Sequence, residues 1–183
     1  MTRTILWIAA GIVLGGIIHI AVVLNLPALA TESLWQRTAG LDATNRVVVL
    51  AASAAGEPNP LGLDPELTYA LCRIDLRAGP GFVRGTLPLA FWSVAVYEPS
   101  GTILYSTTNR DGIGRNLELG IFNAVQTRLL AEQQLDVAQG SLIVESRVDD
   151  VLVAVRLAPA HQAMRMRYEQ ALSRLGCGNL SAA

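Results

Sequence analysis

The densest group of polar and glycine residues in the chain forms one short stretch. It consists of Asn109, Arg110, Asp111, Gly112, Ile113, Gly114, Arg115 and Asn116. Two guanidinium groups can clamp a carboxylate or a phosphate, and the glycines let main-chain amides approach such an anion. The same composition is also typical of a plain connection rich in turn-forming residues. The stretch is therefore our candidate ligand-binding loop, with a simple connecting loop as the alternative.

Side chains suited to catalysis are sparse. General acid–base chemistry needs a histidine or paired carboxylates within hydrogen-bond reach of a substrate. His161 follows Pro159 at the start of a predicted helix, as a solvated surface residue would. Asp149 and Asp150 lie at a predicted hairpin corner, where aspartate serves turn geometry. No GxSxG motif surrounds the candidate serines, which are Ser93, Ser106 and Ser141. We therefore name no catalytic residue, no metal site and no cofactor.

The chain has two cysteines, Cys72 and Cys177. They are too few and too far apart in the sequence for a zinc site, and no CxxC or HxxxH spacing accompanies them. Two cysteines outside the cytoplasm instead predict one disulfide.

The composition narrows the class of protein. Hydrophobic residues make up 51% of the 183 residues and charged residues 16%, which excludes a disordered chain. The formal net charge is −1, and the basic residues, all arginine, are scattered. The sequence therefore lacks the basic patch that nucleic-acid binding requires.

The N-terminus carries a long apolar segment, which runs without a charged residue from Ile5 to Leu26. As a helix it would be about 33 Å long, enough to cross a hydrocarbon layer of about 30 Å. Arg3 precedes the segment, and the next charged residues are Glu32 and Arg37. The positive-inside rule then places the N-terminus in the cytoplasm and the rest of the chain outside, in the periplasm.

An alternative is that the segment is a cleaved signal peptide. Ala28, Leu29 and Ala30 form an A-x-A pattern just after the apolar run, and cleavage there would release a protein beginning at Thr31. The apolar core of a signal peptide is typically 7 to 15 residues long, shorter than this segment, so we favour retention in the inner membrane. Both interpretations predict export.

Within the apolar segment, Gly11 and Gly15 form a GxxxG motif, and His19 lies on the same helical face. Two such helices could pack closely there as a homodimer. The alternative is that glycine is simply frequent in membrane helices.

The first half of the predicted domain begins after the membrane segment. Residues 28–41 suggest a short juxtamembrane helix with Trp35 at the membrane interface. We predict a strand over residues 46–52, a brief helix starting at Asp64, and a strand over residues 70–76. In the last of these strands, alternation places Cys72 on the one buried face.

Two β-hairpins are predicted in the second half. Residues 89–97 and 102–107 flank a Glu-Pro-Ser-Gly turn, and residues 141–146 and 151–157 flank a polar corner at 147–150. Helical spacing appears over residues 125–134 and 160–175, with Gly176 as a helix stop.

These elements predict an α+β protein. It would have one transmembrane helix followed by a small, mainly antiparallel sheet of about five or six strands covered by a C-terminal helix. We divide the chain into a transmembrane anchor (residues 1–27), a juxtamembrane helix and linker (28–45) and an exported domain (46–183). A bond from Cys72 to Cys177 would fasten the end of the last helix to the sheet.

Three segments carry a resemblance to a known family: HIAVVLNLPALA, DPELTYALCRIDL and FWSVAVYEPSGTILYSTTNRDG. In this order they resemble a family of small bacterial membrane proteins called a domain of unknown function, number twelve fifty-four. The resemblance implies a membrane location and a companion protein with a second domain of unknown function. It supplies no activity or catalytic residues.

Three hypotheses for function follow. The first is a non-catalytic, membrane-anchored module of the cell envelope that binds a protein partner. The second is an anion-binding, sensor-like domain that uses the loop at residues 109–116, because the strands and turn before that loop are similar to those of extracellular sensory domains. The third is an enzyme of unknown class.

Overall fold

The computed structural model describes residues 2–29, 34–51, 56, 58–110, 114–132 and 141–180, with residues 27–29 and 131 described by their main chain alone. The chain forms two compact units, Met1–Ser33 and Leu34–Ala183. Each is considered by itself.

The N-terminal unit is the single helix α1 (Thr2–Leu29). Its Thr2–Leu26 part has a mean hydropathy of 2.4, and it is long and apolar enough to cross a membrane. The large apolar side chains along it, such as Trp7 and Leu24, are more than half exposed. A helix with so many exposed apolar side chains is not stable in water, so α1 is either a membrane anchor or a signal sequence.

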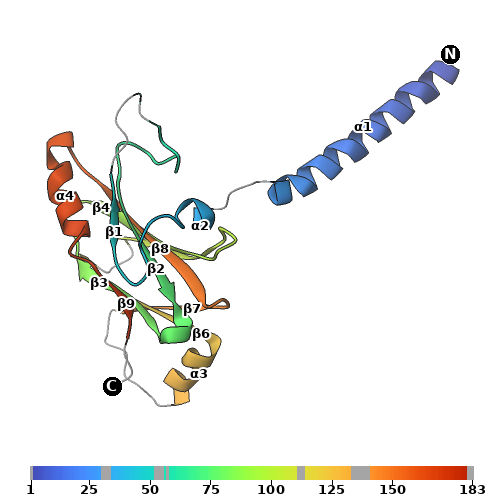
Figure 1. Ribbon diagram of the computed structural model, residues 1–183. Helices are drawn as coiled ribbons and strands as arrows, with labels where there is room; N and C mark the ends of the chain where they lie inside the picture. The colour runs from blue at the N-terminus through green and yellow to red at the C-terminus, as the bar shows by residue number, and fades with distance from the viewer. Residues whose placement is uncertain are drawn as a thin grey trace. The chain divides into compact units, whose positions relative to one another are not determined.

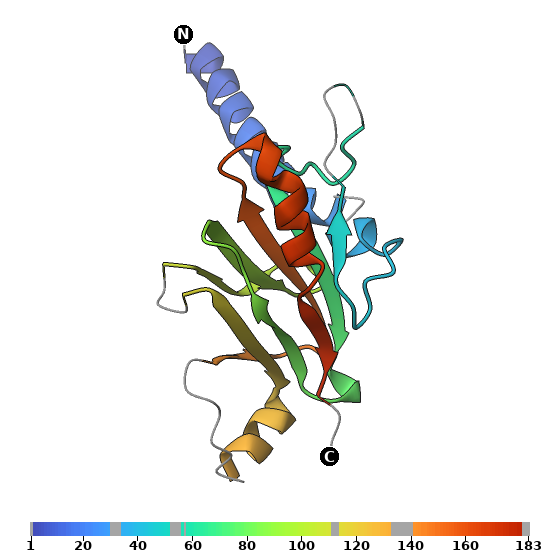
Figure 2. The ribbon, with the colours of Figure 1, turned by 90° about the vertical axis from the view of Figure 1, so that its left-hand side faces the viewer.

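The C-terminal unit contains two β-sheets (Figures 1 and 2). Sheet A has the order β1-β2-β8-β4-β5, and sheet B has the order β7-β6-β3-β9. Sheet A comprises β1 (Val48–Leu50), β2 (Thr68–Asp75), β8 (Asp150–Ala158), β4 (Phe91–Tyr97) and β5 (Ile103–Thr108). Sheet B comprises β7 (Leu142–Ser146), β6 (Asn116–Asn123), β3 (Gly81–Thr86) and β9 (Gly176–Asn179). All strand pairs are antiparallel except β6 with β7.

The main core contains side chains from both sheets and from α4 (Arg165–Leu172). Trp92 of β4, Leu119 of β6 and Leu172 of α4 are at most 2% exposed. The short helix η2 (Gln162–Met164) leads into α4, and η1 (Leu76–Ala78) joins β2 to β3. These features confirm the α+β class, with an apolar N-terminal helix, mainly antiparallel sheets and a C-terminal helix.

The first predicted hairpin is confirmed, because β4 and β5 pair in an antiparallel register. Glu98 N–H donates to Thr102 O at 2.9 Å, and Gly101 N–H donates to Glu98 O at 2.9 Å. Gly101 has a φ of +90°, a conformation that glycine adopts without strain. The local turn residues therefore predicted this pairing correctly.

The prediction of a second hairpin is wrong. The strand β7 pairs in parallel with β6 in sheet B, whereas β8 lies between β2 and β4 in sheet A. The corner between them carries the chain from one sheet to the other, and Ser146 fixes it by donating to Val148 O at 2.6 Å. Five consecutive residues of β8 from Val151 to Val155 are buried, which requires a central position rather than a hairpin edge.

Other boundaries also differ from the prediction. The strands β3, β6 and β9 were not predicted, and Gly176 begins β9 instead of only ending a helix. No helix follows Asp64, whose side chain accepts a hydrogen bond from Glu66 N–H at 2.9 Å in a turn before β2. The helix α3 spans Ala124–Glu132, and residues 133 and 134 of its predicted range lie outside the described residues.

The outer face of sheet A is covered by the short helix α2 (Leu34–Arg37) and by the loop containing Leu61 and Leu63. Leu71 of β2 is therefore buried on this side, while Cys72 is buried on the other, so β2 has two buried faces rather than one. Trp35 packs here beneath Arg73, whose Cζ lies 3.9 Å from the ring centroid. The predicted interfacial tryptophan thus belongs to the folded unit.

Cys72 of β2 and Cys177 of β9 form the expected disulfide, with their Cα atoms 6.6 Å apart. The bond joins sheet A to sheet B across 105 residues of sequence. It indicates that this unit folds in an oxidising compartment.

Replacing both cysteines by alanine should lower the free energy of unfolding by about 4 kcal/mol, because the unfolded chain regains the entropy of a long closed loop. Urea unfolding of the full chain in detergent, followed by tryptophan fluorescence, measures this. Wild type with a reductant is the control and should match the double variant. Equal unfolding midpoints for oxidised wild type and the variant would contradict the prediction.

Candidate functional site

The candidate ligand-binding loop is fastened at its start by Asn109. The main-chain N–H of Asn109 donates to Trp92 O at 3.2 Å, and its side-chain Nδ2 donates to Ala90 O at 3.2 Å. Its Oδ1 is buried without a hydrogen-bond partner among the described residues. Asn109 therefore ties the loop to the segment that precedes β4.

The two arginines of the loop contact different parts of that segment. Arg110 lies over Phe91, with its Cζ 5.9 Å from the ring centroid. Arg115 Nε donates to Leu87 O at 3.3 Å, and Arg115 O accepts from Leu87 N–H at 2.8 Å. Arg110 thus contacts residues 87–91 at Phe91, and Arg115 contacts them at Leu87, at the opposite end.

A hollow of about 430 Å³ lies beside the loop. Its lining is Pro88, Leu89, Ala90, Trp92, Asn109, Gly114 and Arg115. Three residues of the candidate site are therefore brought together around one space, whereas Arg110 and Asn116 are not in its lining. Asn116 Oδ1 instead accepts from Thr86 Oγ1 at 3.0 Å. Asp111 and Gly112 lie outside the described residues.

The other candidate side chains have structural contacts or lie exposed. Asp150 accepts from Arg77 Nη2 at 2.9 Å, and Asp149 accepts from Asn123 Nδ2 at 3.0 Å. His161 is exposed near Glu66 in a hollow of about 270 Å³. Within the described ranges, no three His, Cys, Asp or Glu side chains are grouped to hold a metal ion.

Two arginines and one aspartate have pKa values shifted by structural contacts. Hydrogen bonds from the Arg77 side chain and main chain lower the pKa of Asp75, and the same ion pair raises the pKa of Arg77. Burial lowers the pKa of Arg73, and the charge of Asp150 opposes this effect. Asp75 and Arg77 lie in a cluster that connects the start of η1 to β8 at the surface, so these shifts do not mark a reactive group.

The outer face of sheet B is a second candidate site, which the sequence did not reveal. One row of residues crosses all four strands on this face: Gly178 of β9, Phe82 of β3, Gly120 of β6 and Ile143 of β7. The next row pairs Arg84 with Glu118. Cross-strand partners share a face of a sheet, so these side chains form one surface.

The glycines of that surface make room for aromatic rings. A Cβ atom built on Gly120 would lie 2.9 Å from the Phe122 ring, and one on Gly176 would lie 3.5 Å from the Phe82 ring. Arg84 lies over Phe82, with its Cζ 4.8 Å from the ring centroid. The result is an apolar face that contains two aromatic rings, with one arginine and one glutamate beside them.

Its rim remains exposed to solvent. Ile143 is 45% exposed and Leu180 is 43% exposed, and both line a shallow hollow of about 160 Å³ on this face. A sequence signal for this surface could have been the Gly-Cys-Gly-Asn segment of β9. Its composition disfavours a strand, so the signal was missed.

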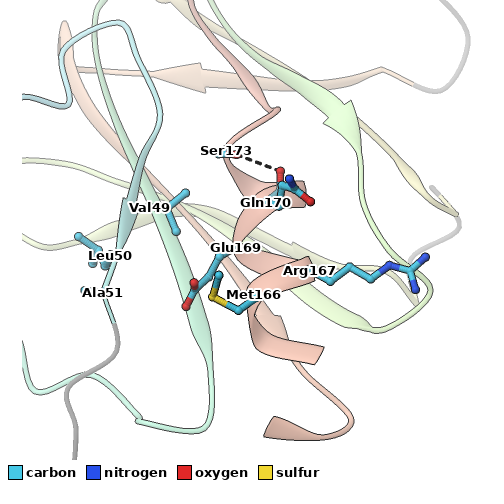
Figure 3. A pocket seen from close by; sticks show the side chains of 8 residues that line it. All are labelled: Val49, Leu50, Ala51, Met166, Arg167, Glu169, Gln170 and Ser173. Atoms are coloured by element: carbon cyan, nitrogen blue, oxygen red, sulfur yellow. Dashed lines mark hydrogen bonds between the residues drawn. The ribbon is translucent and has the colours of Figure 1, made fainter. Parts of the chain in front are cut away.

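A third candidate lies between β1 and α4. The hollow there has a volume of about 630 Å³ and is lined by Val49, Leu50, Ala51, Met166, Arg167, Glu169, Gln170 and Ser173 (Figure 3). It lies between the edge strand β1 of sheet A and one side of α4.

In the N-terminal unit, the three predicted packing residues lie along α1. No atom lies within 4 Å of a Cβ built on Gly11 or on Gly15, and His19 is exposed. The helix therefore presents an open surface at this motif.

Comparison with known proteins identifies only a fold. No family model matches the sequence, and no curated protein matches it. The chain is similar to the crystal structure of the VPA0106 protein from Vibrio parahaemolyticus, with a TM-score of 0.52 and 10% identity, over 64% of this chain. An uncharacterised protein from Burkholderia cenocepacia gives a TM-score of 0.44 and 12% identity, over 77% of this chain. This chain spans 29% of the length of the first protein and 45% of the second.

Proposed function

We propose that this chain is a membrane-anchored envelope protein whose exported domain is a non-catalytic module for binding a protein partner. The observation that carries the proposal is the outer face of sheet B, where the exposed Ile143 and Leu180 and the half-buried Phe82 line one shallow hollow. Aromatic residues and arginine are enriched at protein interfaces, and this surface contains Phe82, Phe122 and Arg84.

The length and charge of α1 support the anchor. Its uncharged run from Ile5 to Leu26 exceeds the 7 to 15 residues typical of a signal-peptide core. Arg3 precedes that run, so the positive-inside rule favours a cytoplasmic N-terminus and a domain on the periplasmic side of the inner membrane. The disulfide agrees with that compartment, because periplasmic proteins fold under oxidising conditions.

The family resemblance suggests the kind of partner. We propose that it is the companion protein with a second domain of unknown function. The family assignment itself remains part of the proposal.

The membrane helix adds a second possible contact. Gly11, Gly15 and His19 lie on one face of α1, where a second copy could approach closely. We propose such a homodimer as a supplement to the partner interface.

The anchor predicts that carbonate washing leaves the intact protein in the membrane. The purified chain should begin before Thr31, and a periplasm-dependent reporter fused after Ala183 should be active. Leu14→Arg should reduce insertion, because an arginine at the centre of a membrane helix costs about 3 kcal/mol. An N-terminal sequence starting at Thr31 would instead show a cleaved signal peptide.

The partner interface predicts the effect of Ile143→Lys. Burying an unpaired ammonium group should weaken binding of the co-expressed companion protein about tenfold or more. Ile103→Lys is the matched control, because Ile103 is 54% exposed on β5 of the other sheet. Interferometry with both full-length proteins in detergent measures the affinities. Unchanged binding by Ile143→Lys would exclude this face.

The second candidate function is binding of a small anion by the loop after the central hairpin. The hollow lined by Asn109, Gly114 and Arg115 favours it, since an arginine and a glycine main chain meet there.

For this candidate, millimolar phosphate, sulfate or acetate should raise the Tm of the full chain. Ligand at 100 times its Kd stabilises by about 2.7 kcal/mol. Arg115→Gln should abolish the shift, whereas Arg128→Gln on α3 should retain it. If none of the three anions changes the Tm, the loop is only a connection.

A further inference from the structure

The free edge of β1 has main-chain groups that can bind another strand. Arg73 N–H donates to Ala43 O at 2.8 Å, and Asn45 N–H donates to Arg73 O at 2.8 Å, so the main chain of Arg73 faces the β1 side. Main-chain groups alternate sides along a strand, so Leu71 and Tyr69 also face β1. Their partners are Val48 and Leu50.

In this register Val48 and Leu50 form main-chain hydrogen bonds with β2, and Val49 lies between them. Its N–H and C=O therefore point away from β2, toward the open edge of sheet A. Ala51, two residues further on, continues the same alternation. The edge thus offers donors and acceptors at the spacing of a β-ladder, and no other described strand than β2 pairs with β1.

The opposite wall is α4, which lies beside β1 in both ribbon views (Figures 1 and 2). Tyr168 and Leu172 are buried in the core and hold this helix in place. Figure 3 shows Val49 and Glu169 extending into the space between the two elements, whereas Arg167 points away. Met166, which is 77% exposed, lies beside Glu169.

Two charged residues line this groove, Arg167 and Glu169, and of these only the Glu169 side chain extends into it (Figure 3). Glu169 is partly exposed and forms no ion pair with any described residue. Val49 and Met166 supply apolar contacts on either side of it. An occupant with an apolar residue and a neighbouring lysine or arginine would complement both features.

We propose that the β1–α4 groove binds an extended segment of a partner protein, which adds to sheet A as a further strand. The main-chain groups of Val49 and Ala51 pair with the segment, and a basic side chain of the segment pairs with Glu169. A strand edge beside a helix is the arrangement by which an added strand is bound in β-augmentation. The groove is a second binding site beyond the proposed function, because it lies on sheet A, whereas Ile143 lies on sheet B.

The test uses the full-length protein in lipid nanodiscs and a phage-displayed library of linear ten-residue peptides. Enriched peptides should alternate apolar and polar residues and contain lysine or arginine. Their affinities are then measured by fluorescence anisotropy with synthetic copies. An absence of enrichment over empty nanodiscs would overturn the proposal.

Val49→Pro is the decisive variant, because it removes an outward N–H that β2 does not use. Proline is tolerated at such edge positions, so the protein should stay folded while peptide affinity falls at least tenfold. The urea midpoint should fall only slightly, because the Val49 side chain is partly buried against the main core. Glu169→Arg should weaken binding about tenfold, and Glu132→Arg on α3 should not. Equal peptide affinity in wild type and Val49→Pro would overturn the proposal.

Two further measurements keep the test decisive. If Val49→Pro unfolds the protein, hydrogen exchange of the wild-type protein is measured instead. Bound peptide must then slow the exchange of both the Val49 and the Ala51 amides. Ile143→Lys should leave peptide affinity unchanged, so a loss would place the peptide on sheet B and refute the groove. Dissociation of a wild-type dimer by Val49→Pro without peptide would assign the edge to a second copy and also refute it.

Discussion

The constraint on which the rest of this fold depends is the burial of the centre of sheet A on both faces. Val151, Val153 and Val155 of β8 face the main core, and Leu152 and Ala154 face the opposite side. Two layers must therefore cover this sheet. Sheet B and α4 cover one side, and α2 with the loop at Leu61 and Leu63 covers the other. The helix α2 is thereby part of the folded C-terminal unit.

Sheet B has the opposite character, because only one of its faces meets the core. Its other face carries glycines at positions where aromatic rings lie close to the main chain. Phe122 is only 8% exposed, and its ring lies against Gly120. Ile143 and Leu180 remain exposed around the shallow hollow on this face. An apolar hollow with both charge signs beside it, Arg84 and Glu118, suits contact with a folded partner.

The features that depend on residues close together in the chain could be predicted from the sequence. The hairpin of β4 and β5 has its turn residues between its strands, and the disulfide follows from having two cysteines in an exported chain. The pairing of β6 with β7 and the central place of β8 depend on partners far along the chain, so local alternation could not distinguish them. The strand β9 contains Gly176 and Gly178, which weaken any strand signal. For the candidate loop, composition grouped Asn109, Gly114 and Arg115, which line one hollow, but it could not show that Arg110 lies over Phe91.

The two edges of sheet A differ in a way that bears on function. The edge strand β5 contacts β7 of sheet B, whereas β1 has open space between itself and α4. Exposed strand edges promote unwanted pairing, and proteins usually shorten, charge or cover them. Here β1 is only three residues long, and Glu169 of the adjacent helix adds charge. Short length and a nearby carboxylate disfavour pairing with arbitrary apolar strands but still permit a short basic segment. The edge is therefore restricted rather than closed, which is the condition for selective strand addition.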